Sequence, residues 1–283
     1  MPPPAARSNC STPPSSDRRV TRRIFGLDFS GAKKAGRSIW LCEGKSSAAG
    51  FQIVNCLPAA DLPGSGVDRA TSLAALRDFI ARAPDAIFGC DFPFSLPRDL
   101  IAGPSWVDFL AGFDHVDADG FREHCRRRSR GREPKRATDR ESKTPWCAFN
   151  IRLYRQSYHG IADLLRPLVA RQQAVVLPMQ RPRQGRAWMV ETCPASTLKH
   201  LRWRGSYKGA GLQPQRQSIL ALLRDKAGLR ALPASIEHTV LENAGGDALD
   251  SIIAGLATAA ALARIEAGES GGDRLEGRVY FKI

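Results

Sequence analysis

Residues 24–31 read IFGLDFSG, an apolar stretch that ends in one acid and a Ser-Gly turn. The apolar side chains favour an extended strand, and Gly31 supplies the backbone freedom that a sharp exit from the strand needs. Such a strand would deliver the Asp28 carboxylate to the edge of a sheet, where sheet proteins usually bind their ligands. Asp28 is therefore the first candidate site residue. The alternative is that Asp28 only caps the turn.

Two later strands are expected to end in an acid as well. Residues 86–91 read AIFGCD, and the strand must stop just past Asp91 because Pro93 cannot continue a ladder. A further apolar run at residues 187–190 leads into Glu191 and then into a helix that Pro194 can open. Acids at strand ends thus recur three times along the chain.

The strongest helical pattern lies near the C-terminus, in the stretch GGDALDSIIAGLATAAALARIEAG. Asp247 and Asp250 are three residues apart in its first turn, so they share one face, and the helix dipole favours negative charge there. Two readings remain open at this point. Both acids belong to a site, or Asp247 caps the helix and Asp250 is a first-turn acid.

The other elements follow from periodicity and turn residues. The first strand and two further apolar runs predict a three-stranded antiparallel meander, and EGRVYFKI predicts a short last strand. The remaining runs are residues 37–42 and 51–57, and the expected helices cover residues 67–83, 195–203 and 214–227.

If these strands form one sheet and the last helix crosses its edge, the acids Asp28, Asp91, Glu191 and Asp247 or Asp250 converge. Carboxylates a few ångströms apart repel one another unless a cation neutralises them. Mg²⁺ or Mn²⁺ fits best, because these hard ions prefer carboxylate and water oxygens. Zinc is disfavoured because the five histidines have no ligand spacing.

The formal charge of +14 is concentrated in two segments. Residues 1–23 are rich in Pro, Ser and Arg, carry a net charge of +4 and are expected to be a disordered leader before a single domain at residues 24–283. Residues 121–143 carry a net charge of +6. This concentration favours an anionic partner, with nucleic acid first. The alternative is a solvated run of charge.

The basic run lies in a segment, residues 95–185, that interrupts the alternation of strands and helices and is expected to be a mostly helical insertion. Arg152 and Arg155 share a predicted helix face and are candidates for phosphate contacts, or else form a surface pair beside Asp163. The expected nucleic-acid contacts are Arg126, Arg127, Arg128, Arg130, Arg132, Lys135, Arg136, Arg152 and Arg155.

The seven cysteines are odd in number and never spaced as C-x-x-C, which argues against a disulfide framework and a zinc ribbon. An uninterrupted apolar run of about 18 residues is missing, which argues against a membrane span. A soluble cytoplasmic protein is expected.

The motifs GLDFSG, CDFPFSLP, VETCPAS, GDALDSIIAGLATA and EGRVY, in this order, resemble the family catalogued as domain of unknown function 429. Its members are predicted nucleases of the ribonuclease H-like superfamily. The likeness spans residues 24–283 apart from the arginine-rich part of the insertion.

The resemblance implies an α/β fold of the ribonuclease H-like kind, in which three antiparallel strands precede parallel strands and helices flank the mixed sheet. It also implies a metal-dependent nuclease site. Asp28, Asp91 and Asp247 or Asp250 match the acid positions of the superfamily, and Glu191 lies in the family's own E-x-x-P motif. The departure from ribonuclease H is that the first helix has no clear catalytic acid, so the junction-resolvase branch is the closer analogy.

The sequence leaves three functions open. The first is a magnesium-dependent phosphodiesterase that acts on DNA or RNA. The second is a phosphotransferase of the sugar-kinase-like superfamily, although the chain has no duplicated half and no second glycine-rich phosphate loop. The third is a nucleic-acid-binding module without turnover, whose binding would be sensitive to salt.

Overall fold

The structure is a computed structural model that describes residues 22–269 and 271–283. Most of the expected disordered leader lies outside these ranges. Its last two residues belong to the fold, because β1 begins at Arg23 and the Arg22 guanidinium lies 3.7 Å from the centre of the Trp188 ring. The domain therefore begins earlier than the charge pattern suggested.

Seven strands form one mixed sheet in the order β3-β2-β1-β4-β6-β5, with β7 paired to β6. The first three strands are antiparallel neighbours, and β4, β5, β6 and β7 pair in parallel. This confirms the expected α/β class with antiparallel strands followed by parallel ones. The bounds are β1 Arg23–Asp28, β2 Trp40–Ser47, β3 Gly50–Pro58, β4 Ala86–Asp91, β5 Ala174–Leu177, β6 Ala187–Thr192 and β7 Val279–Tyr280.

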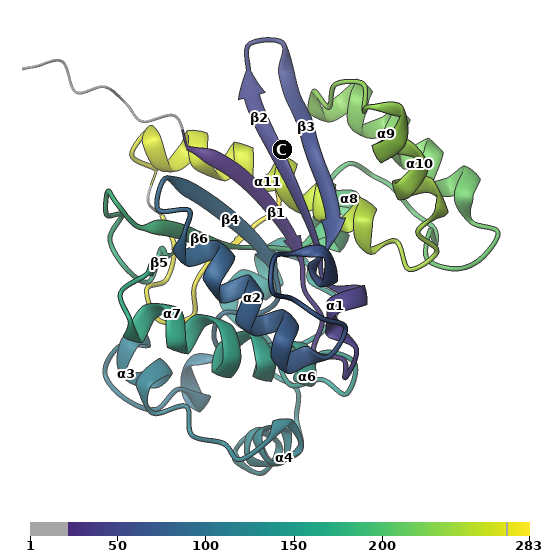
Figure 1. Cartoon of the computed structure of the whole chain (residues 1–283). Coiled ribbons are helices and arrows are strands. Elements are labelled where there is room, and N and C mark those ends of the chain that lie inside the picture. The colour runs from purple at the N-terminus through teal and green to yellow at the C-terminus, as the bar shows by residue number, and fades with distance from the viewer. Residues whose placement is uncertain (1–21, 270) are drawn as a thin grey trace, which may run out of the picture.

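Helices cover both faces of the sheet (Figure 1). On the side of one face lie α2 Arg69–Ala81 and the helices between β4 and β5, some of which pack on other helices and not on the sheet itself: α3 Trp106–Ala111, α4 Ala118–Arg128, α5 Ala137–Ser142, α6 Tyr154–His159, the π-helical turn Gly160–Leu165 and α7 Arg166–Ala170. The other face packs against α8 Pro194–His200, α9 Gln213–Ala227, α10 Ala234–Glu242 and α11 Asp247–Glu266. Short helices at Ala35–Ser38 (α1), Ala59–Asp61 and Arg98–Leu100 complete the fold.

The expected insertion is mostly helical, but it does not extend to residue 185. β5 lies within it and pairs in parallel with β6, so this part belongs to the sheet. The four apolar residues of β5 are too few to show a period, which is why the sequence did not reveal the strand. The basic helix α4 packs against α6, and Figure 1 shows it on the side of α6 away from the sheet.

α11 is the core helix of the second face. It is long and apolar enough to span a membrane, yet most of it is buried against the sheet. Its backbone comes very close to β1, where a Cβ atom added to Gly26 would lie 2.0 Å from the Ser251 carbonyl oxygen and 2.2 Å from the Gly255 nitrogen. Glycine in β1 therefore sets the distance between helix and sheet, and with it the position of the first turn of α11.

Replacing Gly26 with Ala is expected to lower the free energy of unfolding by about 3 kcal/mol, because α11 must move away from β1. Urea denaturation measures this loss. Gly112→Ala is the control, since an added Cβ atom there meets only ordinary contacts and φ is negative. Equal stability of the two variants would contradict the close packing of α11 on β1.

Candidate active site

Asp28 and Asp91 lie side by side at the carboxyl ends of β1 and β4. The two strands are parallel and in register, and Asp28 pairs with Asp91. Side chains alternate along a strand. Phe25 and Phe88 stack at 4.7 Å on the α2 face, so the two acids, each three residues further along, project to the opposite face, toward α11. Asp28 is buried and Asp91 is half-buried.

The first turn of α11 brings further acids to this edge. Asp250 is buried at 2% exposure, and Asp247 is half-buried. Neither caps the helix. Gly246 is the N-cap, and the Asn243 Oδ1 accepts the hydrogen bond from the Ala248 nitrogen at 3.1 Å. The capping alternative for Asp247 is thereby removed, and the carboxylates are free for other interactions.

Asp28 does not cap its turn either. In that turn, the Ser30 hydroxyl accepts a hydrogen bond from the Ala32 nitrogen at 3.3 Å. The pKa of Asp28 is set by burial and by the charges of its neighbours. Among the described residues, no hydrogen bond is one of the main causes of its shift. The charge of Lys208 offsets part of this burial, but Asp28 has no ion pair or hydrogen bond of its own among the described residues, which buried charges normally have.

Two residues of the loop between α8 and α9 cover the cluster. The Lys208 Nζ lies 2.5 Å from Asp250 Oδ2, and the Tyr207 hydroxyl donates to Asp250 Oδ1 at 2.6 Å. Both oxygens of Asp250 are therefore occupied by the loop. Sequence reasoning missed these residues because nothing in RGSYKGAG links it to an acid some forty residues away.

The electrostatics of the cluster follow from crowding of like charges. Burial, and then the charge of Asp250, raise the pKa of Asp28 well above its usual range and that of Asp91 to about 7. Lys208 opposes both shifts. Burial lowers the pKa of Lys208, but the carboxylates of Asp250 and Asp28 outweigh this and raise it. The ammonium thus acts as the counter-ion of several acids at once.

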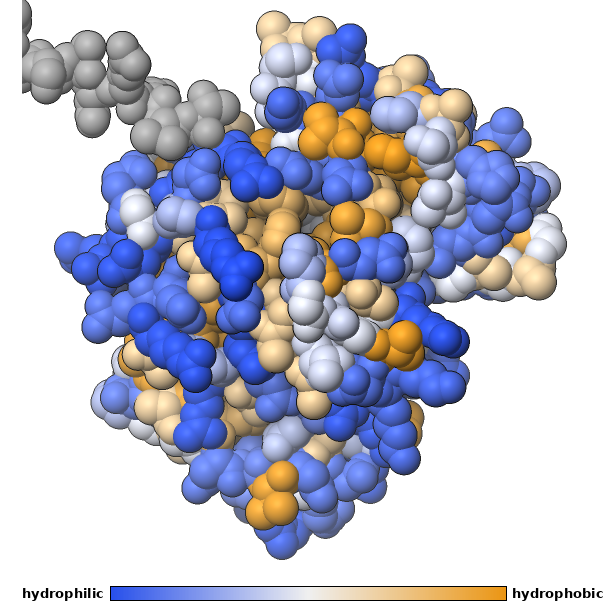
Figure 2. Space-filling model, in the orientation of Figure 1, coloured by the Kyte–Doolittle hydropathy of each residue, from blue (hydrophilic) through white to orange (hydrophobic). Residues whose placement is uncertain are grey.

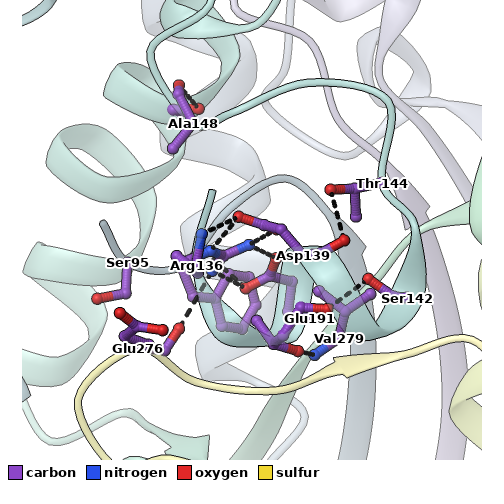
Figure 3. Close-up of polar contacts among 12 residues, drawn as sticks. Ser95, Arg136, Asp139, Ser142, Thr144, Ala148, Glu191, Glu276 and Val279 are labelled. Carbon is purple, nitrogen blue, oxygen red and sulfur yellow. Dashed lines mark hydrogen bonds and ion pairs between the residues drawn. The ribbon is translucent and has the colours of Figure 1, made fainter. Parts of the chain in front are cut away.

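Glu191 does not join this cluster. It pairs with Cys90, one residue before Asp91, so its side chain lies on the opposite face of the sheet from Asp91. There it forms an ion pair with Arg136, with Nη2 to Oε1 at 2.5 Å and Nη1 to Oε2 at 2.8 Å (Figure 3). The Phe94 nitrogen also donates to Oε2 at 3.0 Å. This corrects the expectation that the Glu191 carboxylate lies beside the aspartates at one edge of the sheet.

Arg136 was expected on a basic surface, and the structure instead buries it at 1% exposure. Its five N–H groups are all used, by Asp139, Glu191 and the Glu276 carbonyl oxygen. These partners come from α5, β6 and the segment before β7 (Figure 3). Burial lowers the pKa of Arg136, but the charges of Glu191 and Asp139 raise it by more. Arg136 is therefore a structural ion-pair residue that no phosphate reaches.

The other expected contacts remain largely on the surface. Lys135 is half-buried, and its Nζ donates to the Thr144 carbonyl oxygen at 2.5 Å. The region around α4 is largely hydrophilic in Figure 2. The Arg155 carbonyl oxygen packs against Gly31, three residues after Asp28 in the sequence, and the Arg155 guanidinium is 3.5 Å from Asp119. The exposed residues are Arg126, Arg127, Arg128, Arg130, Arg132, Arg152 and Arg155.

Two open hollows with basic side chains in their walls adjoin elements of the site. One, of about 500 Å³, is bordered by Lys143, Lys199, Arg204, Trp203 and Tyr207, and therefore touches the loop that covers Asp250. The other, of about 410 Å³, lies next to Gly31 and has walls of mixed charge, with Lys33, Arg69 and Arg155 beside Asp117 and Asp119. Basic residues that the sequence pattern did not single out thus line both hollows: Lys33, Arg69, Lys199 and Arg204.

A smaller pocket of about 120 Å³ lies beside Asp91, between the carboxyl ends of β4 and β6. Its walls are mostly apolar and include Pro93, Trp146 and Leu153. Arg136 is its one arginine, and this side chain has no free N–H group. The pocket therefore offers a phosphate no free guanidinium N–H group.

The carboxylates match a hard divalent ion in their chemistry, because Asp28 is buried with no ion pair or hydrogen bond of its own among the described residues and an ammonium already lies among the acids. Their present arrangement does not enclose one. Across residues 22–269 and 271–283, no three His, Cys, Asp or Glu side chains are grouped to hold a metal ion. Lys208 and Tyr207 contact both oxygens of Asp250, so an ion that binds this carboxylate must compete with the ammonium for its charge.

Comparison of the chain with family models, with curated proteins and with solved structures found no match.

Replacing Arg136 with Met is expected to lower the free energy of unfolding by about 3–5 kcal/mol, because Glu191 and Asp139 would be left buried without their partner. Urea denaturation measures the loss. Arg127→Met on the exposed face of α4 is the matched control and should change stability by less than about 0.5 kcal/mol. A loss below about 1 kcal/mol for the Arg136 variant would show that the buried ion pairs do not stabilise the fold.

Proposed function

We propose that the chain is a metal-dependent phosphodiesterase that acts on nucleic acid and has a ribonuclease H-like core. The observation that carries the proposal is the in-register pair Asp28 and Asp91, with Asp250 from α11 above it and a cation already among the three. The resemblance of GLDFSG, CDFPFSLP and GDALDSIIAGLATA to predicted nucleases supports the same reading. The cytoplasm remains the proposed location.

Asp28, Asp91 and Asp250 would hold Mg²⁺ or Mn²⁺, with Asp247 at the edge of the set. When bound, such an ion activates a water molecule and stabilises the leaving oxygen of a phosphodiester. The protein itself contributes the positions of the three carboxylates. β1 and β4 fix two carboxylates by register, and Gly26 fixes the depth at which α11 presents the third. Glu191 has a structural role in this proposal, since its partner is Arg136.

The basic side chains of the two hollows support nucleic acid as the substrate. A polyanion at the acid cluster would meet positive charge from Lys199 and Arg204 in the first hollow and from Lys33 and Arg155 in the second, where Asp117 and Asp119 offset part of it. Trp203 and Tyr207 add aromatic surface to the first hollow, and unpaired bases stack on such surfaces. The basic helix α4 packs on α6 and would act at longer range.

Asp28→Asn is expected to reduce Mg²⁺-dependent cleavage of a labelled oligonucleotide by at least about 100-fold, since the isosteric amide cannot supply the charge that a divalent ion needs. Cleavage is measured on a gel with single-stranded, duplex and branched DNA and RNA. Asp78→Asn is the control, because Asp78 is exposed on α2. Full activity of the Asp28 variant would refute the assigned site.

The route of the nucleic acid is tested by removing charge in pairs. Lys199→Gln with Arg204→Gln is expected to weaken binding and to reduce the dependence of log K on log salt concentration by about 1 to 2, since up to two phosphate contacts are lost. Fluorescence anisotropy in Ca²⁺ measures binding without turnover. Arg126→Gln with Arg127→Gln on α4 is the matched comparison, with an expected change of less than half this size. If the α4 double variant weakened binding more than the Lys199 and Arg204 double variant, the phosphate contacts would be assigned to α4.

A further inference from the structure

The loop of residues 205–211 places one cation among the acids. It contains three glycines, at 205, 209 and 211, whose φ angles of +131°, +137° and +77° are those that side-chain-bearing residues rarely adopt. Lys208 lies between them and reaches Asp250. Gly246 permits this approach, since a Cβ atom there would lie 3.1 Å from both the Lys208 Cγ and the Tyr207 ring.

The backbone on either side of Lys208 is held firmly. Arg216 of α9, buried at 2% exposure, donates to the carbonyl oxygen of Tyr207 at 2.8 Å and to that of Gly209 at 3.2 Å. The Gly209 nitrogen donates to the Ala244 carbonyl oxygen at 2.7 Å. The Lys208 backbone therefore keeps its place over the site whatever its side chain does.

The Lys208 side chain, by contrast, is free to leave. It is 50% exposed, while the Asp250 side chain that it contacts is 3% exposed. Rotation about its own bonds would move the ammonium into water without displacing any buried side chain. The Tyr207 hydroxyl would keep its hydrogen bond to Asp250 Oδ1, and Oδ2 would become available.

We infer that Lys208 is an exchangeable counter-ion of the acid cluster, which competes with the divalent ion for Asp250 and must swing out before that ion binds. The inference rests on the proposed metal-dependent function and adds its regulation. Lys208 is thus a positioning residue, which holds the carboxylates of the cluster together in the metal-free state. It keeps the carboxylates neutralised while no metal is bound, at the cost of weaker metal affinity.

The physical reason for competition is twofold. A divalent ion must break the charge-assisted bond between Lys208 and Asp250, and it must also bind while an ammonium repels it from the same carboxylates. Both effects disappear when residue 208 is neutral. Arg155 and Lys199 border the neighbouring hollows without an ion pair to these acids, so they would steer the substrate and leave the ion unaffected.

The test is Mn²⁺ affinity of the purified full chain without nucleic acid, measured by electron paramagnetic resonance of the free ion. Lys208→Gln is expected to bind Mn²⁺ at least tenfold more tightly than the wild type, because it loses one charge-assisted bond to Asp250. Lys226→Gln is the control. It removes the same charge at an exposed ion pair with Asp225 on α9 and should leave the affinity within twofold.

Thermal unfolding provides a second readout. In EDTA, Lys208→Gln should have a lower Tm than the wild type, since the buried acids lose their counter-ion. Saturating Mn²⁺ should then raise its Tm by more than it raises that of the wild type. If Lys208→Gln fails to fold, Tyr207→Phe replaces it. This variant frees Asp250 Oδ1, keeps the lysine and should bind Mn²⁺ about threefold more tightly.

The outcomes separate this inference from the function on which it rests. If the wild type binds Mn²⁺ and Lys208→Gln binds it no more tightly, Lys208 is not a competitor, while the metal site stands. Weaker binding by Lys208→Gln would likewise overturn the inference, because the lysine would then support the ion. If neither protein binds Mn²⁺ at millimolar concentration, both the metal site and the competition are refuted.

Discussion

The in-register pairing of β1 with β4 is the constraint on which the site depends. Parallel strands in register bring equivalent positions to the same edge, and the two-residue period of side chains decides which face each position serves. Asp28 and Asp91 satisfy both conditions. The glycine at position 26 then lets α11 approach that face closely enough for Asp250 to join them. A shift of one residue in either strand would point its acid toward the core on the opposite face of the sheet and separate the carboxylates.

Bringing these acids together has an electrostatic cost that the fold meets with its own cation. Burial and mutual repulsion raise the pKa values of Asp28 and Asp91, and the Lys208 ammonium offsets part of this effect. Without a cation, a site of this kind would hold its carboxylates together only in the protonated form. The glycine-rich loop therefore belongs to the site, although its sequence has no catalytic signature.

Much of this arrangement was predictable, and the part that was not has a definite physical cause. Apolar runs that end in an acid predicted β1 and β4, and the alanine-rich run predicted α11, because these signals are local. Glu191 carried the same local signal and was misplaced. Its face depends on the register of β6 against β4, which pairs Glu191 with Cys90, and register between distant strands is a tertiary property. Lys208 and Arg136 were missed as ion-pair residues for the same reason. Asp250 lies 42 residues from Lys208 and Glu191 lies 55 residues from Arg136, distances over which charge patterning along the chain gives no information. Only the second partner of Arg136, Asp139, is close in the sequence.

The ion pairs of Arg136 and of Lys208 differ in burial and in the number of partners, which indicates that only the second can be replaced by a ligand. Arg136 is buried and has all five N–H groups bonded, so no ligand could replace any of its contacts without leaving a charge unpaired. Lys208 has one carboxylate partner within ion-pair distance and a side chain that is half in water. Its charge also acts on Asp28 and Asp91, so a cation that takes its place can neutralise the same group of acids. A fixed network stabilises the fold, whereas a replaceable ion pair leaves a site able to exchange one cation for another. Because the replaceable pair lies at the carboxyl ends of β1 and β4, the chemistry of this protein is most reasonably sought there, and the network around Glu191 is the frame that holds the neighbouring strand in place.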